Sequence, residues 1–296
     1  MAILETLSKD HLKYRYYPDD LPYTLAESVL SDLLRPEHRI FEKTFLVLHP
    51  EIFAGGFVPL ILDALQQEGF CVHFVEEFYL DLGRAAEIWR YQWNASSVSR
   101  MLFFDLKGSL APAAFLGLSR TCSGDLPATL ALHLLKGSSR FRERLKPHQF
   151  RSLLPFTNRA MTFVHCPDEP ADFLRELFIL YGTEKANAIA AQYSNSQIAW
   201  GEVLSRLSTF GEHSSFGAFD AQHADYWSLW LEYLERIGSP GAGDRFRSMD
   251  FDEQWLALSS IANLLENERD GTHPLITTKH MPEVVETWRA TEYAQV

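Results

Sequence analysis

The sequence has few cysteines, no long apolar segment and fewer basic than acidic side chains. Its 296 residues include three cysteines, and no two of them form a Cys-x-x-Cys pair. A disulfide framework is therefore not expected, and a reducing cytoplasm is the default compartment. No apolar run reaches the roughly 18 residues that a membrane-spanning helix requires. The first residues also lack the basic and then apolar pattern of a signal peptide, so we expect a cytoplasmic protein without membrane contact.

The charge of the chain is unevenly distributed. The 27 basic and 39 acidic side chains give a formal net charge of −12, which argues against binding to long nucleic acids. Residues 186–296 carry 16 acidic and 7 basic side chains, whereas residues 136–159 carry seven basic side chains and one acidic side chain. This local basic excess suits a small anionic ligand, although a solvated basic loop fits the same composition.

Apolar residues are abundant enough for a sizeable core. They make up 46 % of the chain, and aromatic residues make up 13 %. This content excludes wholesale disorder. We expect three regions: an N-terminal arm (1–43) with a short helix capped by Thr24, a central domain (44–183) and a helical C-terminal extension (184–296).

The central region alternates between short apolar runs and helical patterns. The strands are expected at 44–50, 71–75, 111–117 and 160–164, and the helices at 57–70, 84–93, 125–135 and 172–180. Between them, the polar and basic stretch 138–158 is expected to be a long loop. This order favours an α+β sandwich, with helices packed on a mixed or antiparallel sheet.

The C-terminal third has a different pattern, in which tryptophan recurs at helical spacing. The repeated positions are Trp227, Trp230, Leu231 and Leu234, then Trp255, Leu258, Ile261 and Leu265. A last helix is predicted to begin at Pro282. Tryptophan at this spacing is most typical of core packing, so we expect an all-α extension. Binding of a protein partner through these helices is a separate expectation.

One histidine has the setting of a nucleophile. His165 follows the predicted strand 160–164, and Glu176 lies in the next predicted helix, from where it can orient the imidazole ring. A histidine held by a carboxylate beside an arginine is what a phosphorylatable nucleophile requires. A packed or solvated histidine is the plain alternative. A thiol nucleophile or metal pair involving Cys166 is disfavoured, because neighbouring strand residues point apart.

Four stretches carry a resemblance to a known family. They are TFLVLHPE, GGFVPLILDALQQEGFCV, KPHQFRS and MTFVHCPDEPADFLRELF. Together they resemble nucleoside diphosphate kinase across residues 44–182, somewhat under half of the chain. The resemblance places His165 on the phosphorylated histidine and Glu176 on the glutamate that supports it. It also places Asp168 on the aspartate of the histidine motif and Arg151 on a phosphate-binding arginine.

The chain departs from the family at several phosphate-binding positions. His49 stands where the family has a lysine, and His133 stands where it has a second arginine. Ser139 replaces a threonine, and Thr162 replaces an asparagine. Trp89 or Tyr91 takes the place of a tyrosine near the base. Histidine is only partly charged at neutral pH, so the two histidines weaken the stabilisation of phosphate charge.

The resemblance implies a ferredoxin-like α/β sandwich, a homo-oligomer and a substrate that is a nucleoside tri- or diphosphate with Mg²⁺ on its phosphates. The expected activity is transfer of the γ-phosphate through a phosphohistidine to a nucleotide or to a specialised acceptor. Two alternatives stay open at the level of sequence. One is a catalytically impaired nucleotide-binding scaffold, which the loss of the lysine favours. The other is nucleotide hydrolysis, with His165 as acid or base.

Overall fold

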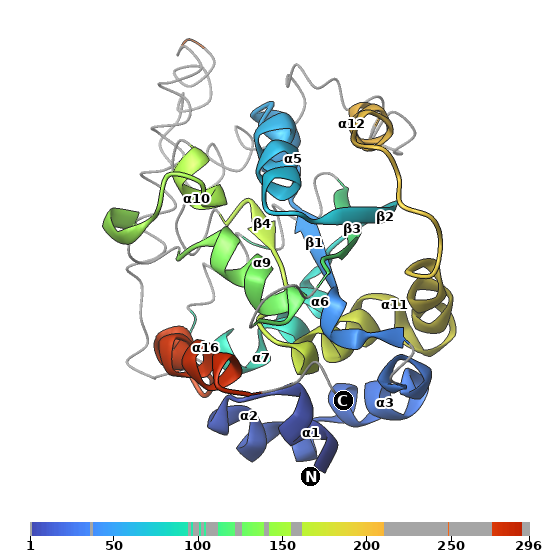
Figure 1. Cartoon of the computed structure of the whole chain (residues 1–296), viewed down its shortest axis with the longest axis vertical. Helices are drawn as coiled ribbons and strands as arrows, with labels where there is room; N and C mark the ends of the chain where they lie inside the picture. Colours follow the sequence, from blue (N-terminus) through green and yellow to red (C-terminus); the bar gives the residue numbers. More distant parts are fainter. Residues whose placement is uncertain are drawn as a thin grey trace.

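A four-stranded sheet lies at the centre of the molecule (Figure 1). The computed structural model describes residues 2–35, 38–93, 96, 101, 104, 112–121, 126–138, 142–154, 162–209, 248 and 274–291. In these ranges the strands are β1 (Lys43–Leu48), β2 (Cys71–Phe78), β3 (Ala113–Ser119) and β4 (Val164–His165). They pair in the order β2-β3-β1-β4, and every pairing is antiparallel.

The connections between the strands define the fold class. Helix α5 (Val58–Gln67) connects β1 to β2, after the short helix α4 (Pro50–Ala54). Helix α9 (Ala128–Lys136) connects β3 to β4. The resulting order β1-α5-β2-β3-α9-β4, with this strand order, is the ferredoxin-like arrangement. The prediction of an α+β sandwich is therefore confirmed, and the sheet is antiparallel.

Both faces of the sheet are covered, which explains why its central strands β1 and β3 are mostly apolar. Along β1, the side chains of Phe45 and Val47 join one core cluster, and those of Leu46 and Leu48 join the other. This alternation is the two-residue period of a strand. A strand with both faces buried needs apolar residues at every position, and this is what the run TFLVL supplies.

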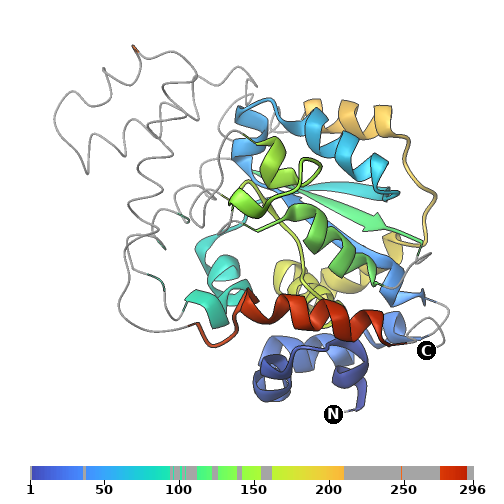
Figure 2. The same ribbon diagram turned by 60° about the vertical axis from the view of Figure 1, so that its left-hand side comes forward.

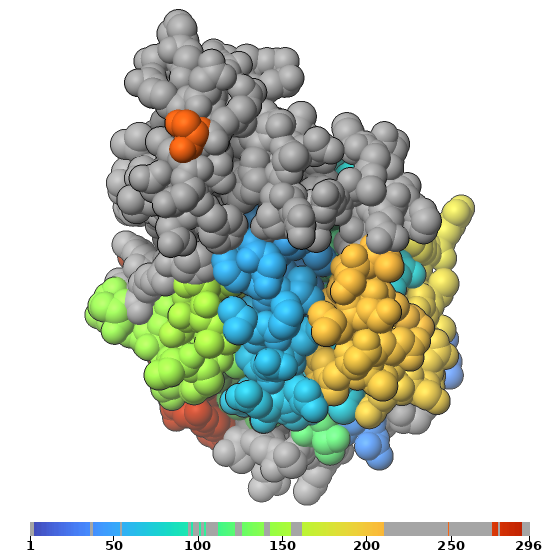
Figure 3. Space-filling model, turned by 90° about the horizontal axis from the view of Figure 1, so that it is seen from above, coloured from blue at the N-terminus to red at the C-terminus, as the bar shows by residue number. Residues whose placement is uncertain are grey.

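The first layer of helices contains α5, α10 (Phe150–Leu153) and α12 (Trp200–Ser208). Seen from above, α5 lies between the other two, and the three helices form one continuous surface (Figure 3). Val203 and Leu207 of α12 are buried in the same cluster as the apolar face of α5. Ala128, Leu132 and Leu135 of α9 belong to the same cluster, so α9 covers this face of the sheet together with these three helices.

The second layer contains α11 (Pro170–Gln192) and segments from both ends of the sequence. Beside α11 lie α1 (Ala2–Leu7), α2 (His11–Tyr16), α3 (Leu21–Val29), α6 (Leu82–Ile88), α7 (Arg90–Trp93) and α16 (Met281–Arg289). Figure 2 shows α16 running alongside the N-terminal helices. Residues of all these helices except α2 share one buried core cluster, and Leu12 of α2 packs against it.

One buried carboxylate joins the two ends of the sequence. Glu169 precedes α11 and accepts hydrogen bonds from Ser8 Oγ at 2.7 Å, the Lys9 backbone N–H at 2.7 Å, Lys13 Nζ at 2.8 Å and Trp288 Nε1 at 2.7 Å. Glu169 and Trp288 are both fully buried. Burial raises the pKa of Glu169, but Lys13 and these hydrogen bonds lower it more strongly, so the carboxyl stays ionised.

The starts of two elements with a local cause differ from the prediction. The helix expected after Thr24 begins at Leu21, because the Asp20 side chain accepts a hydrogen bond from the Tyr23 backbone N–H and caps it. The strand expected at 160–164 begins only at Val164; residues 160 and 161 lie outside the described ranges. Phe163 has φ +60°, a left-handed conformation that interrupts an extended strand.

Other elements differ in extent from the prediction. The stretch 138–158, expected to be a loop, contains α10. The helix expected at 172–180 is α11, which continues to Gln192 across a break at Gly182, where φ is +68°. The region predicted as a helix over 84–93 forms the two short helices α6 and α7.

The C-terminal extension is described only in part. Helix α16 confirms the predicted last helix, whereas the two tryptophan-rich helices expected around 227–234 and 255–265 fall outside the described residues. The domain boundaries stay predictions. Among the helices that the structure describes, none is both long and apolar enough to cross a membrane.

Candidate functional site

The predicted nucleophile and its carboxylate are in contact. His165 ends β4, where it is paired with Val47 of β1, and Glu176 lies on α11. The His165 Nε2 atom is 2.7 Å from Glu176 Oε2, and both side chains are about nine-tenths buried. An ionised carboxylate only accepts hydrogen bonds, so Nε2 carries the proton in this contact. Nδ1 of His165 has no hydrogen-bond partner among the described residues.

Aromatic rings surround His165. The Trp89 ring lies 5.1 Å from the His165 ring in an edge-to-face arrangement, and Phe104 lies 4.7 Å from Trp89. Trp93 stacks on Trp89 at 5.4 Å. These rings give the site an apolar wall, which lowers the local polarity around the imidazole and offers a flat surface to a planar ligand.

His165 lines a cavity of about 730 Å³, a size in the usual range for small-molecule sites. Glu176, Trp89 and Arg151 also line it. Its walls extend beyond the central region, because Lys13 comes from the N-terminal arm and residues 274, 276 and 277 come from the C-terminal extension.

Asp168, which lines the cavity, contacts two residues of helix α9, the helix that connects β3 to β4. His133 Nδ1 is 2.6 Å from Asp168 Oδ1, and Lys136 Nζ is 3.4 Å from the same oxygen. Burial raises the pKa of Asp168, but His133 and Lys136 lower it more strongly. The pKa of Asp168 therefore lies well below its usual range. Burial lowers the pKa of His133, which is therefore neutral at pH 7 and adds no positive charge to the cavity.

Arg151 supplies a buried cation. It lies on α10, and its Nη1 atom donates to the Gly137 carbonyl at 2.5 Å. Its Nε atom is buried and has no hydrogen-bond partner within the described ranges. Burial lowers the pKa of Arg151 to about 10, so the guanidinium remains protonated at neutral pH. This donor is one that a ligand anion can satisfy.

Gly137 is required where it stands. It ends α9 with φ +78° and ψ 170°, a combination essentially restricted to glycine. An added Cβ would also lie 2.7 Å from the Leu145 side chain. The turn directs the Gly137 carbonyl towards Arg151.

His49 lies outside the cavity lining. Its side chain is 1 % exposed, its Nδ1 atom lies 3.3 Å from Thr162 Oγ1 and 3.6 Å from Glu51 Oε1, and its ring packs against Phe104. Thr162 itself lines the cavity. The geometry therefore gives no support to His49 as a phosphate ligand, although His165, Glu176, Arg151, His133 and Thr162 are brought together as expected.

The remaining candidates have different settings. Tyr91 lines the cavity, and its hydroxyl donates to Asp20 at 2.6 Å, so that hydroxyl already has a structural partner. Ser139 falls outside the described residues. Lys136 was not among the predicted site residues, and its only signal in the sequence is its place in the basic stretch 136–159.

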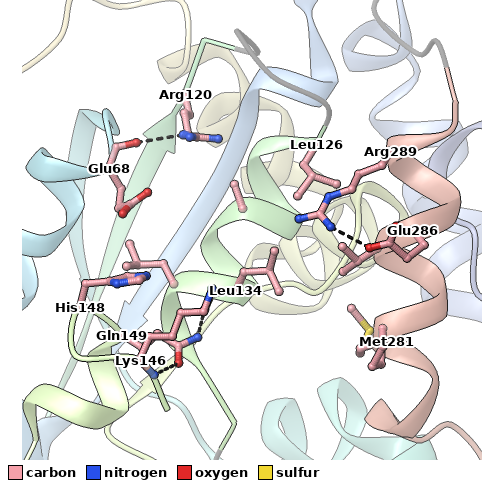
Figure 4. Close-up of a pocket in the computed structure, with 14 residues that line it drawn as sticks. Glu68, Arg120, Leu126, Leu134, Lys146, His148, Gln149, Met281, Glu286 and Arg289 are labelled. Atoms are coloured by element: carbon pink, nitrogen blue, oxygen red, sulfur yellow. Dashed lines mark hydrogen bonds and ion pairs between the residues drawn. The ribbon is translucent and has the colours of Figure 1, made fainter. Parts of the chain in front are cut away.

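A second cavity of about 570 Å³ adjoins the first and lies between α9 and α16 (Figure 4). The two cavities share Leu134, Gln149, Met281 and Pro282. Apolar side chains of α9 and α16 line the second cavity, among them Ala131, Leu135 and Val285. Lys146 and His148 also line it, and both are exposed. In the part of the chain that is described, no cluster of three or more histidine, cysteine, aspartate or glutamate side chains has the geometry to hold a metal ion.

Comparison with known proteins gives limited similarity. No family model matches the chain, and neither does any curated protein sequence. Among solved structures, the chain is similar to the nucleoside diphosphate kinase of Aquifex aeolicus, with 19 % identity and a TM-score of 0.39, over 47 % of this chain and 94 % of that one. It is also similar to an NDP kinase from Pyrobaculum aerophilum, with 13 % identity and a TM-score of 0.35 over the same shares. At these values the matches say nothing about activity.

Proposed function

We propose that the protein is a nucleotide-dependent phosphotransferase that moves the γ-phosphate of a nucleoside triphosphate through a phosphohistidine on His165. The contact between His165 and Glu176 carries this proposal. Because Glu176 engages Nε2, Nδ1 is the nitrogen whose lone pair is available for attack. The carboxylate also stabilises the positive charge that develops on the ring as Nδ1 reacts.

The proposed reaction has two balanced steps. Nδ1 of His165 attacks the γ-phosphorus, so the N–P bond forms while the bond to the bridging oxygen breaks, and the nucleoside diphosphate leaves with that electron pair. A phosphate oxygen of the acceptor then attacks the phosphohistidine, and the N–P electron pair returns to Nδ1. The proton on Nε2 stays in its hydrogen bond to Glu176 throughout.

Charge and shape in the cavity support a phosphorylated substrate. Arg151 has a buried Nε donor that a phosphate oxygen can satisfy. The aromatic wall of Trp89 and Trp93 suits a nucleobase. Mg²⁺ is expected to enter with the substrate, on its phosphates, where it neutralises part of their charge.

The test is phosphorylation of the full chain by [γ-³²P]ATP with Mg²⁺. The wild type should take up acid-labile label, and His165→Ala should take up none. His148→Ala is the matched control, because His148 is exposed and lines the second cavity rather than the first. Absence of label in the wild type, or equal labelling of His165→Ala, would end the phosphohistidine proposal.

A second function has one observation in its favour. His49 lies outside the cavity lining, so the site lacks a cation at the position where the family resemblance predicts a lysine. This favours a nucleotide-binding scaffold without turnover, whose helical extension binds a partner. Calorimetry separates the two functions: nucleotide binding without a phosphoenzyme supports the scaffold.

A further inference from the structure

The predicted residues supply only one buried cation for a phosphoryl group transferred to His165. A transferring phosphoryl group carries charge on three oxygens, and positioned cations provide most of its stabilisation. His49 is buried outside the cavity lining, and His133 is neutral at pH 7 because burial lowers its pKa. Arg151 is then the only buried cation among the residues predicted to bind phosphate.

Lys136 lies where a second cation is needed. It occupies the last turn of α9, lines the cavity, and has a side chain that is 9 % exposed. Its Nζ atom donates to the Cys166 carbonyl at 3.3 Å and to Asp168 Oδ1 at 3.4 Å. Cys166 directly follows His165, so these contacts hold the ammonium group against the segment that presents the nucleophile.

Lys136 keeps its charge and a spare donor. Burial lowers the pKa of Lys136, but Cys166 and Asp168 raise it more strongly. The pKa of Lys136 therefore lies above its usual value. An ammonium group has three N–H donors, and two are used within the described ranges. Both contacts are long for hydrogen bonds, so a phosphate oxygen can compete for them.

The other buried lysine of the cavity is already neutralised. Lys13 Nζ lies 2.8 Å from Glu169 and 2.5 Å from Asp172. Two carboxylates at such distances leave no net positive charge for a ligand when both are ionised. In contrast, Lys136 Nζ faces a single carboxylate, that of Asp168, at the longer distance of 3.4 Å.

We propose that Lys136 is the phosphate-binding lysine of this site and that it acts with Arg151 in place of the cation that His49 does not provide. This inference rests on the proposed function. Arg151 Nη1 binds the carbonyl of Gly137, the residue that follows Lys136, so one turn of chain positions both cations. The third N–H of Lys136 donates to a phosphate oxygen of the substrate.

The proposal predicts a loss that depends on phosphate. Lys136→Met should weaken the binding of Mg-ATP and Mg-ADP to the full chain by about tenfold or more, as loss of a charged hydrogen bond does. Binding of adenosine should change less than about twofold. Lys136→Gln keeps a donor without the charge, and it carries the test if the methionine variant does not fold. Lys146→Met is the control, because Lys146 is exposed and lies at the second cavity.

The outcomes separate the two proposals. Equal weakening of ATP and adenosine would assign Lys136 a structural role only and overturn the inference. Unchanged affinity of Lys136→Met for ATP would also overturn the inference. If His165 of the wild type is nevertheless labelled, the proposed function still stands. If the wild type binds no nucleotide and takes up no label, the proposed function fails and Lys136 loses its ligand with it.

Discussion

The hydrogen bond between Glu176 and His165 makes a quantitative prediction for Glu176→Gln. The substitution keeps the shape of the side chain and an oxygen that accepts from Nε2, but it removes the negative charge. Both side chains are about nine-tenths buried, so solvent screens the lost charge only weakly. A hydrogen bond to a charged group contributes about 1.5–3 kcal/mol and a neutral one about 0.5–1.5 kcal/mol, a difference of roughly 1–1.5 kcal/mol.

This difference applies to the step in which charge develops on the imidazole. At about 1.4 kcal/mol per tenfold change in rate, the phosphorylation of His165 should slow about 5- to 12-fold. Rapid quenching after mixing with [γ-³²P]ATP measures this rate directly. Circular dichroism checks that the variant is folded, and Glu202→Gln, an exposed position on α12, is the matched control. A Glu176→Gln rate within twofold of the wild type would refute the assigned role of the carboxylate.

Three further predictions concern stability. Trp288→Phe removes a buried donor from Glu169 and should lower the free energy of unfolding by about 1–3 kcal/mol in urea titrations; an unchanged midpoint would contradict it. Gly137→Ala should cost about 1–3 kcal/mol, because φ is +78° and the new Cβ meets Leu145; calorimetric scans would show a lower Tm, and an equal Tm would count against this strain. The pKa of His133 is lower in the native chain than in the unfolded chain. As the pH falls below about 6.5, the unfolded chain therefore takes up a proton that the native chain does not, and the contribution of His133 to stability is lost. His133→Gln should therefore lose stability less steeply than the wild type between about pH 7 and pH 5, and parallel curves would exclude this assignment.

Elements with a strong local pattern were predictable from the sequence. The run TFLVL predicted β1, and the apolar spacing after Gly56 predicted α5, because both patterns reflect burial that repeats with the period of the element. The contact between His165 and Glu176 was predictable for a similar reason, since it needs only a strand end and the helix that follows it.

Features that depend on the tertiary structure were not predictable. The backbone of Phe163 adopts φ +60°, which the sequence does not signal, and this shortens β4. The side chain of His49 contacts Thr162, more than 100 positions away, and lies outside the cavity lining. Lys136 is recognisable as a site residue only once Cys166, which lies 30 positions later, is seen beside it.

The junction at Glu169 has a consequence for how the protein is made. Lys13 and Glu169 are 156 positions apart, and Trp288 follows Glu169 by 119 positions. During synthesis, more than half of the chain is therefore made between Lys13 of the N-terminal arm and its contact Glu169, and α16 is made later still. Contacts at such separation form slowly, and chains are exposed to misassembly in the meantime. Because both segments also wall the cavity, a ribosome-bound chain that contains His165 and Glu176 still lacks one side of its site until α16 has left the exit tunnel.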